Sequence, residues 1–300
     1  MERLIERRTA LALVGLPFAL ALEASLAGCN GMLSPSSKDL TAGRGGTAPT
    51  TQSPIGDILK DTEAVRTVHG FTFHLLRGCY EAKPGEGVLV SPLSALHALA
   101  LAENGAAGET LSQMEAATGM DVQGLTSYLG AYDRRMGGES LSDVQEKGDP
   151  LALKSANSIW LRDSGSLSVS DSYLSTCKDS LSAQVFSAPF DETTRSDINT
   201  WAKSKTDGMI EEAVGEIPDR AQLYLINALA LDSAWSDPYE DDDVQDDTFT
   251  TEDGTEQSVR MMHSHETDYL ENDSAEGFVR PYENNLAFVA LLPKVGVGIG

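Results

Sequence analysis

The chain has 300 residues, enough for one large domain or two of ordinary size. It carries 22 Lys and Arg against 46 Asp and Glu, a formal net charge of −24, and this acidity excludes nucleic-acid binding because phosphates would be repelled. A hydrophobic content of 41% is enough for a globular core, so we expect a folded protein with an acidic, solvated surface.

The first 29 residues have the pattern of an export signal. Arginines at the start precede an apolar run, Leu11 to Leu22, which is too short to cross a bilayer. The following Leu26-Ala27-Gly28-Cys29 resembles the lipobox of bacterial lipoproteins. That resemblance implies that Cys29 becomes a lipidated N-terminus on an exterior face of the membrane. An ordinary signal peptide with an incidental cysteine is the alternative, and both predict an exported, extracellular protein.

Residues 30–54 are rich in Ser, Thr, Gly and Pro, which predicts a flexible linker. The globular domain is predicted to cover residues 55–300. Its apolar residues from Ile58 to Leu76 recur at helical spacing, which predicts one long amphipathic helix ending near Cys79 and Tyr80.

The stretch from Gly87 to Gln113 reads as strand, helix and helix. Ser91 is a helix N-cap with Pro92 at the first helical position, and the helix that follows is apolar on nearly every side, which predicts burial. Asn104-Gly105 is expected to supply a left-handed helix end. A second helix is predicted from about Gly108 to Thr118, closed by Gly119.

The motifs Ser-Pro-x-Ser and Asn-Gly-Ala-x-Gly-x-Thr in this stretch resemble the second and third helices of the serpins, a family of suicide inhibitors of serine and cysteine proteases. Further motifs resemble serpin segments in the same chain order, and together they cover about residues 60 to 293: Ser155 to Leu161, Ile198 to Trp201 with Thr206 to Ile210, Leu223 to Leu231 continuing through Trp235 to Tyr239, and Phe278 to Tyr282 with Leu286 to Pro293. One departure is Leu231-Asp232-Ser233, where the family usually has Phe-Lys-Gly.

The resemblance implies an α+β serpin-like fold, with several helices around mixed and antiparallel β-sheets. Leu223 to Leu231 has a single amide, Asn227, among apolar residues, which predicts a strand covered on both faces. A buried amide needs polar partners. By resemblance these include Ser91 and Ser94, at the shutter where the central sheet opens, and Trp235 packs at the upper end of that sheet. The alternative is that Asn227 is a satisfied core amide without a switching role.

By resemblance the protein is an inhibitor and not an enzyme. A target serine or cysteine protease cleaves a reactive loop, which inserts into the central sheet beside Leu223 to Leu231 and drags the acyl-bound protease with it. No cofactor is needed, and we expect a monomer whose partners are the protease and, through the lipid anchor, the membrane. The chain stops at Gly300 without the family's later segments, including the reactive loop, so we hypothesise that it is a fragment. A non-inhibitory serpin and an acidic surface-binding module are the alternatives.

Catalytic patterns are incomplete. Ser175 and Lys178 fit Ser-x-x-Lys, and Lys205 to Gly208 is similar to Lys-Thr-Gly, but no Ser-Asp-Asn lies between them and an Asp interrupts the second motif. Asp163-Ser164-Gly165 is similar to a protease nucleophile loop without its flanking Gly. These departures from the catalytic motifs argue against an enzymatic function.

Metal sites are disfavoured as well. His263 and His265 could share one face of a strand but lack a third ligand, and the acidic run Asp237 to Asp247 lacks the Gly and the terminal Glu of a calcium loop, which predicts a solvated loop. Cys79 and Cys177 are predicted to be buried free thiols, although an exported protein could pair them.

Overall fold

The computed structural model describes residues 9–14 as backbone, and residues 33–34, 36–44, 54–137, 153–165, 169–251, 253–283 and 286–297. The chain divides into two compact units, Met1–Asp232 and Ser233–Gly300. Each unit is described by itself.

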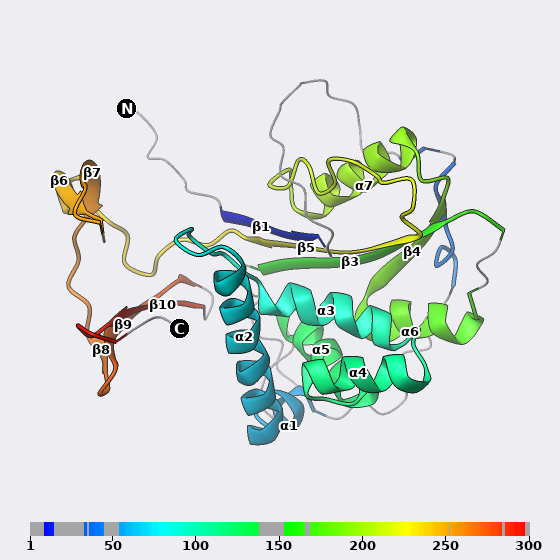
Figure 1. Cartoon of the computed structure of the whole chain (residues 1–300), viewed down its shortest axis with the longest axis horizontal. Helices are drawn as coiled ribbons and strands as arrows, with labels where there is room; N and C mark the ends of the chain where they lie inside the picture. Colours follow the sequence, from blue (N-terminus) through cyan, green and yellow to red (C-terminus); the bar gives the residue numbers. More distant parts are fainter. Residues whose placement is uncertain are drawn as a thin grey trace. The chain divides into compact units, whose positions relative to one another are not determined.

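The first unit is a five-stranded sheet with helices on both faces. Its strands are β1 (Thr9–Val14), β2 (Lys38–Asp39), β3 (Leu153–Arg162), β4 (Ala183–Ala188) and β5 (Leu223–Leu231). Its helices are α1 (Ile55–Leu59), α2 (Thr62–Ala82), α3 (Pro92–Glu103), α4 (Gly108–Thr118), α5 (Val122–Met136), α6 (Asp171–Leu181) and α7 (Glu192–Lys205). The strand order is β1-β5-β3-β4-β2, with β3 antiparallel to β5 and parallel to β4. In Figure 1, α7 lies on one face of the sheet and α3, α5 and α6 lie on the other.

The alternation of side chains along β3 builds two apolar layers, because successive residues of a strand point to opposite faces. Ile159 and Leu161 belong to the core under α3, α5 and α6. Trp160 lies in the core under α7, where it stacks on Phe186 with ring centroids 4.2 Å apart and packs in the same cluster as Ile198. A strand buried on both faces explains the nearly continuous apolar runs in the sequence.

The second unit consists of two small sheets. Its elements are the 3₁₀ turn η1 (Asp241–Asp243) and strands β6 (Val244–Thr250), β7 (Glu256–Met262), β8 (Asp268–Glu271), β9 (Ala275–Pro281) and β10 (Ala287–Pro293). Strands β6 and β7 pair, and β10, β9 and β8 form the other sheet. The predicted hairpin is confirmed, since β9 and β10 are antiparallel. The prediction of a loop over the whole acidic run is wrong in part, because Asp246 and Asp247 pair with β7.

Two predictions at the helices need correction. The long helix predicted to include Ile58 and Leu59 is two helices, because Asp61 interrupts it: the Asp61 side chain accepts a hydrogen bond from the Ala64 amide at 2.8 Å and caps α2. Asn104-Gly105 does not supply a left-handed end, since Asn104 has a φ of −65°. A side chain at Gly105 would instead meet the Tyr173 ring at 3.3 Å, so close packing is the reason for this glycine. The left-handed Gly119 after α4 is confirmed, with a φ of 76°.

Part of the segment predicted as a flexible linker is docked on the first unit. Strand β2 pairs antiparallel with β4, and Lys178 of α6 donates to the Thr41 carbonyl at 3.0 Å. Farther toward the N-terminus, the Ser34 amide donates to Asp197 of α7 at 2.8 Å. The low apolar content of residues 36–44 therefore does not prevent docking, because main-chain pairing with a sheet edge needs few apolar side chains.

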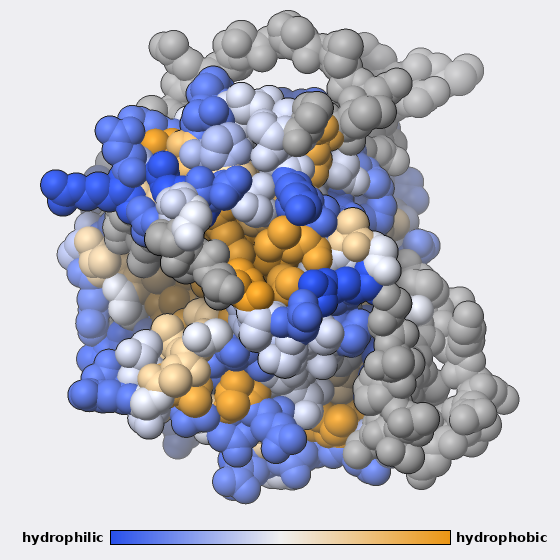
Figure 2. Space-filling view, turned by 90° about the vertical axis from the view of Figure 1, so that its right-hand side faces the viewer, coloured by the Kyte–Doolittle hydropathy of each residue, from blue (hydrophilic) through white to orange (hydrophobic). Residues whose placement is uncertain are grey.

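Figure 2 shows the face at which β2, β4 and α6 lie, with an apolar area surrounded by hydrophilic side chains. No helix among the described residues is long and apolar enough to cross a membrane.

Cys79 and Cys177 are free thiols, as predicted, but Cys79 is only half-buried. Burial raises the pKa of Cys177 to about 11.

Two glycines in helices provide a matched test of the packing. A Cβ at Gly130 of α5 would lie 2.8 Å from the Ser180 carbonyl oxygen, whereas a Cβ at Gly70 of α2 would meet nothing within 4 Å. We expect Gly130→Ala to lower the free energy of unfolding by about 1–3 kcal/mol through overpacking. Gly70→Ala should raise it by about 0.5–1 kcal/mol through helix propensity. Urea unfolding measures both, and a stabilised Gly130→Ala would contradict the close approach of α5 and α6.

Candidate functional site

The two serines predicted for the shutter lie at the start of α3. Ser91 caps the helix, since its Oγ accepts from the Ser94 amide at 3.2 Å and the same hydroxyl donates to Ser94 Oγ at 2.9 Å. Both side chains are buried. The serines therefore satisfy each other within the first helical turn.

Asn227 meets a second asparagine across the sheet. Asn157 of β3 is its direct partner in the β3–β5 register. The Asn227 Nδ2 group donates to Asn157 Oδ1 at 2.8 Å and to Ser155 Oγ at 2.9 Å. Within the described residues, no hydrogen bond joins Asn227 to Ser91 or Ser94, so the expected partners are replaced by residues of the neighbouring strand. Strand register explains this, because it places the two amides opposite each other.

The polar contacts continue from Asn157 into the helical layer. The Asn157 Nδ2 group lies 3.2 Å from His97 Nδ1 and donates to the Leu181 carbonyl at 2.9 Å. The other ring nitrogen, His97 Nε2, lies 3.3 Å from Asp133 Oδ1 of α5, without hydrogen-bond alignment. These contacts form a chain, Asn227–Asn157–His97–Asp133, which we call the amide–histidine chain. It connects β5, β3, α3 and α5.

The amide–histidine chain is buried but not fully satisfied. His97 has no exposed surface, and Asn157 and Asn227 are 2% and 1% exposed. Among the described residues, Asn227 Oδ1 and Asp133 Oδ2 are buried oxygens without a hydrogen-bond partner. An unsatisfied buried polar group costs about 1–3 kcal/mol. The chain therefore contributes less stability than an apolar core of the same shape would, which marks it as a candidate functional site.

Sequence reasoning identified Asn227 and missed Asn157, His97 and Asp133. Asn157 gave a signal of the same kind, a lone amide beside apolar residues in a predicted strand. His97 is a polar residue within a helix predicted to be buried on nearly every side. Asp133 gave no signal, because a carboxylate in an amphipathic helix is normally on its solvated face.

Trp235 lies in the second unit. It stacks on Tyr282 with ring centroids 4.2 Å apart, and the Arg280 guanidinium lies 5.3 Å from its ring centre. Its packing at the upper end of the central sheet stays a prediction. Cys29, the predicted lipid anchor, lies outside the described residues.

The residues considered for catalysis or metal binding do not come together in one site. Lys178 of the Ser-x-x-Lys pair is engaged by the Thr41 carbonyl and the Arg44 carbonyl. His263 and His265 follow β7 and do not lie in it. The described part of the chain holds no group of three His, Cys, Asp or Glu side chains that could bind a metal ion.

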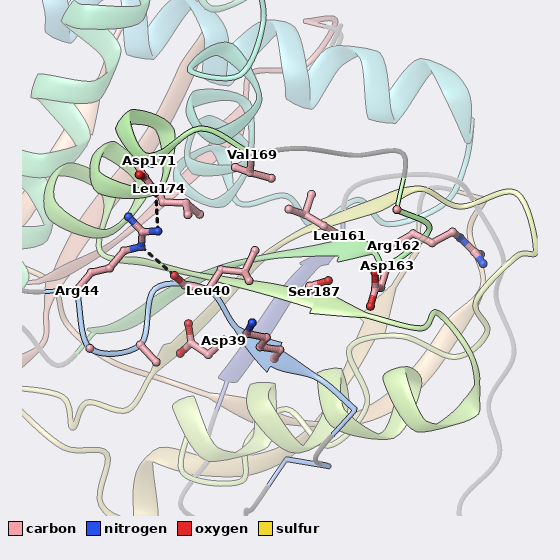
Figure 3. A pocket seen from close by; sticks show the side chains of 14 residues that line it. Asp39, Leu40, Arg44, Leu161, Arg162, Asp163, Val169, Asp171, Leu174 and Ser187 are labelled. Carbon is pink, nitrogen blue, oxygen red and sulfur yellow. Dashed lines mark hydrogen bonds and ion pairs between the residues drawn. The ribbon is translucent and has the colours of Figure 1, made fainter.

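A cavity of about 620 Å³ lies between residues 38–44, the end of β3, and α6 (Figure 3). Leu161 and Leu174 give it an apolar wall. Part of its charged lining is already paired, since Arg44 binds Asp171 at 2.7 Å and donates to the Leu40 carbonyl at 3.0 Å. The Arg162 guanidinium binds the Ala221 and Asp219 carbonyls. The cavity thus borders the docked N-terminal segment, and these contacts occupy the guanidinium groups of Arg44 and Arg162.

The edge of β5 opposite β3 is paired with β1. There β1 pairs antiparallel with β5, in a register that runs from Thr9↔Leu231 to Val14↔Ile226. Asn227 lies within this paired stretch, so the amide–histidine chain starts at the strand that pairs with β1.

These features define an α+β protein whose central five-stranded sheet is covered by helices on both faces. A family profile described as "Serpin (serine protease inhibitor)" matches residues 66–299. The chain belongs to the serpin family, and the predicted fold class is confirmed.

Individual relatives agree with this family. The chain is similar to an uncharacterized serpin-like protein of Thermococcus kodakarensis, with 30% identity over 259 residues that cover 83% of this chain and 58% of the relative. It is also similar to the leukocyte elastase inhibitor of Equus caballus, with 26% identity over 74% of this chain and 59% of the relative. The native-state crystal structure of the thermophilic serpin tengpin matches with a TM-score of 0.76 and 34% identity, over 88% of this chain and 64% of that chain. The chain thus spans a little over half the length of these curated relatives.

Replacing Asn157 tests the energetic role of the amide–histidine chain. Asn157→Ala leaves His97 Nδ1 and the Leu181 carbonyl without their donor, so we expect the free energy of unfolding to fall by about 2–4 kcal/mol. Asn104→Ala is the control, since Asn104 is half-buried and donates to Ala100 and Thr126 away from this chain. The control should lose about 1 kcal/mol in urea unfolding. Equal losses in the two variants would contradict a coupled network.

Proposed function

We propose that the whole protein is a serpin-type inhibitor of serine or cysteine proteases. It acts by cleavage of a reactive loop and insertion of that loop as a strand beside β5, and it is not an enzyme. The observation that supports this proposal most directly is the β5 edge, where an antiparallel strand already pairs over six residues. Family membership and the resemblance to named protease inhibitors support it further.

The energetics of strand addition are favourable at this edge. Main-chain hydrogen bonds contribute about 0.5–1.5 kcal/mol each, so a strand of six or more residues gains several kcal/mol. The face of β5 under α7 is already packed, since Tyr224, Ile226 and Ala228 belong to that core. An inserted strand therefore needs only to extend an existing core, with the rest of the driving force coming from release of strain.

The test is covalent trapping by the full gene product without its leader. Incubated with a panel of serine and cysteine proteases, it should give a complex that survives SDS in denaturing gels, because the protease stays acyl-bound when it is displaced. The same protease with its nucleophile chemically blocked should give no such band. Loop cleavage without a complex, across the whole panel, would exclude inhibition and favour a non-inhibitory, acidic surface-binding serpin.

We also propose that the protein is exported and anchored by lipid at Cys29. The support is the sequence pattern that ends in Leu26-Ala27-Gly28-Cys29. Expressed in bacteria with labelled palmitate, the full chain should incorporate label and sediment with membranes. Cys29→Ser should lose both properties, whereas Cys79→Ser should lose neither. Label that persists in Cys29→Ser would contradict the anchor.

A further inference from the structure

Residues 33, 34 and 36–44 are fixed to the first unit at both ends, and we call them the N-terminal clamp. At one end, the Ser34 amide donates to Asp197 Oδ1 of α7 at 2.8 Å, and the Ser34 hydroxyl donates to Asp197 Oδ2 at 2.7 Å. At the other end, Lys178 of α6 donates to the Arg44 carbonyl. The clamp therefore runs from α7 to α6 across one edge of the sheet.

The contacts of Asp197 show that the clamp occupies a site built to hold it. Asp197 is 5% exposed, and a buried carboxylate without hydrogen-bond donors is strongly unfavourable. Within the described ranges, the hydrogen bonds to both of its oxygens come from Ser34. Leu33 adds an apolar contact with the core under α7, and the Leu40 amide donates to the Val185 carbonyl at 2.7 Å. Side-chain, apolar and main-chain contacts thus hold the clamp along its length.

We propose that the N-terminal clamp holds the first unit close to a lipid bilayer, with the α7 side toward the headgroups. This inference rests on the proposed lipid anchor at Cys29. Ser34 follows Cys29 by five positions, and five residues span at most about 18 Å. The contact between Ser34 and Asp197 therefore lies within about 18 Å of the lipidated cysteine. The partner of the α7 side is the membrane surface.

A free linker would place the domain differently. The chain from Cys29 to Ile55 reaches about 90 Å when it is fully extended, and a flexible chain of that length has a mean end-to-end distance of about 25–30 Å. A domain on such a linker turns freely and moves through a wide zone. Residues 45–54 add no reach in the clamped protein, because the chain is fixed to the same unit before them, at Arg44, and after them, in α1.

The charge of the chain opposes close approach to a membrane that contains anionic lipid. The formal net charge is −24, and anionic headgroups repel it over a screening distance of about 10 Å. A long flexible linker would let this repulsion move the domain away, whereas a tie of five residues prevents it. Under the proposed inhibitory function, the clamp therefore directs the protein to proteases that act at the membrane surface.

The test measures energy transfer from a dye on the lipidated full gene product to a dye-labelled headgroup lipid in phosphatidylcholine vesicles. The donor dye is attached to Thr193→Cys, an exposed position of α7, or to Ala117→Cys, an exposed position of α4. Helix α4 packs against α3, on the opposite side of the sheet from α7 (Figure 1). Cys79→Ser is the background, and the buried Cys177 thiol, whose pKa is raised, stays unlabelled. Transfer should be stronger from Thr193→Cys than from Ala117→Cys.

Two matched insertions distinguish the clamp from a free linker. About 30 Gly and Ser residues are inserted either between Gly31 and Met32, before the clamp, or between Gly46 and Thr47, after it. The first insertion adds a mean reach of about 30 Å and should lower transfer from Thr193→Cys by about twofold or more. The second should leave transfer unchanged, because it lies between two fixed points of one unit. Equal losses from the two insertions, or equal transfer from the two dye positions, would overturn the proposal.

Hydrogen exchange separates failure of the clamp from failure of the anchor. In the full gene product without its leader and with Cys29→Ser, the Leu40 amide should be protected from exchange, since it donates to the Val185 carbonyl. A Leu40 amide that exchanges at the rate of an unfolded chain would overturn the clamp. If the lipidated protein does not bind vesicles, the proposed anchor fails and the placement at the membrane fails with it, while the exchange of Leu40 still judges the clamp.

Discussion

The first unit depends on the pairing of β3 with β5 through nine consecutive residue pairs, Leu153↔Leu231 to Leu161↔Leu223. This pairing places apolar side chains alternately under α7 and under α3, α5 and α6, so that one sheet supplies both cores. It also forces Asn157 and Asn227 to face each other in the interior. The polar chain in the core is thus a consequence of register, because a shift of β5 by one residue would turn Asn227 to the opposite face, away from Asn157.

The two sides of the sheet are paired with different parts of the chain. At one edge, β2 is held to β4 by main-chain pairing and by side chains of α6 and α7, including Lys178 and Asp197. At the other edge, β5 pairs with β1, a stretch of the predicted export signal. Exposed strand edges promote unwanted association, and here the outer edges of β5 and β4 are paired with β1 and β2. An edge that accepts a strand is a liability in most proteins, and it is the feature on which the proposed inhibitory mechanism depends.

The amide–histidine chain connects this edge to the helical layer. A polar chain in a core costs stability wherever a group is left without a partner, and Asn227 Oδ1 is such a group. Under the proposed mechanism the sheet opens at this place, and a fully satisfied core would resist strand insertion there. Docking of residues 36–44 follows the opposite principle, since most of its polar groups find partners and the segment is held in place.

The sequence by itself determined the family, the position of most elements and the strand Leu223–Leu231, whose bounds agree with the prediction. These features depend on local rules: caps such as Ser91, left-handed glycines such as Gly119, and apolar runs of strand length. Only the tertiary structure decided which groups surround Asn227. Partners in a core are set by strand register and helix packing, which bring Asn157, His97 and Asp133 together from positions up to 60 residues apart. Spacing along the chain carries no record of those contacts, so no local pattern could have predicted them.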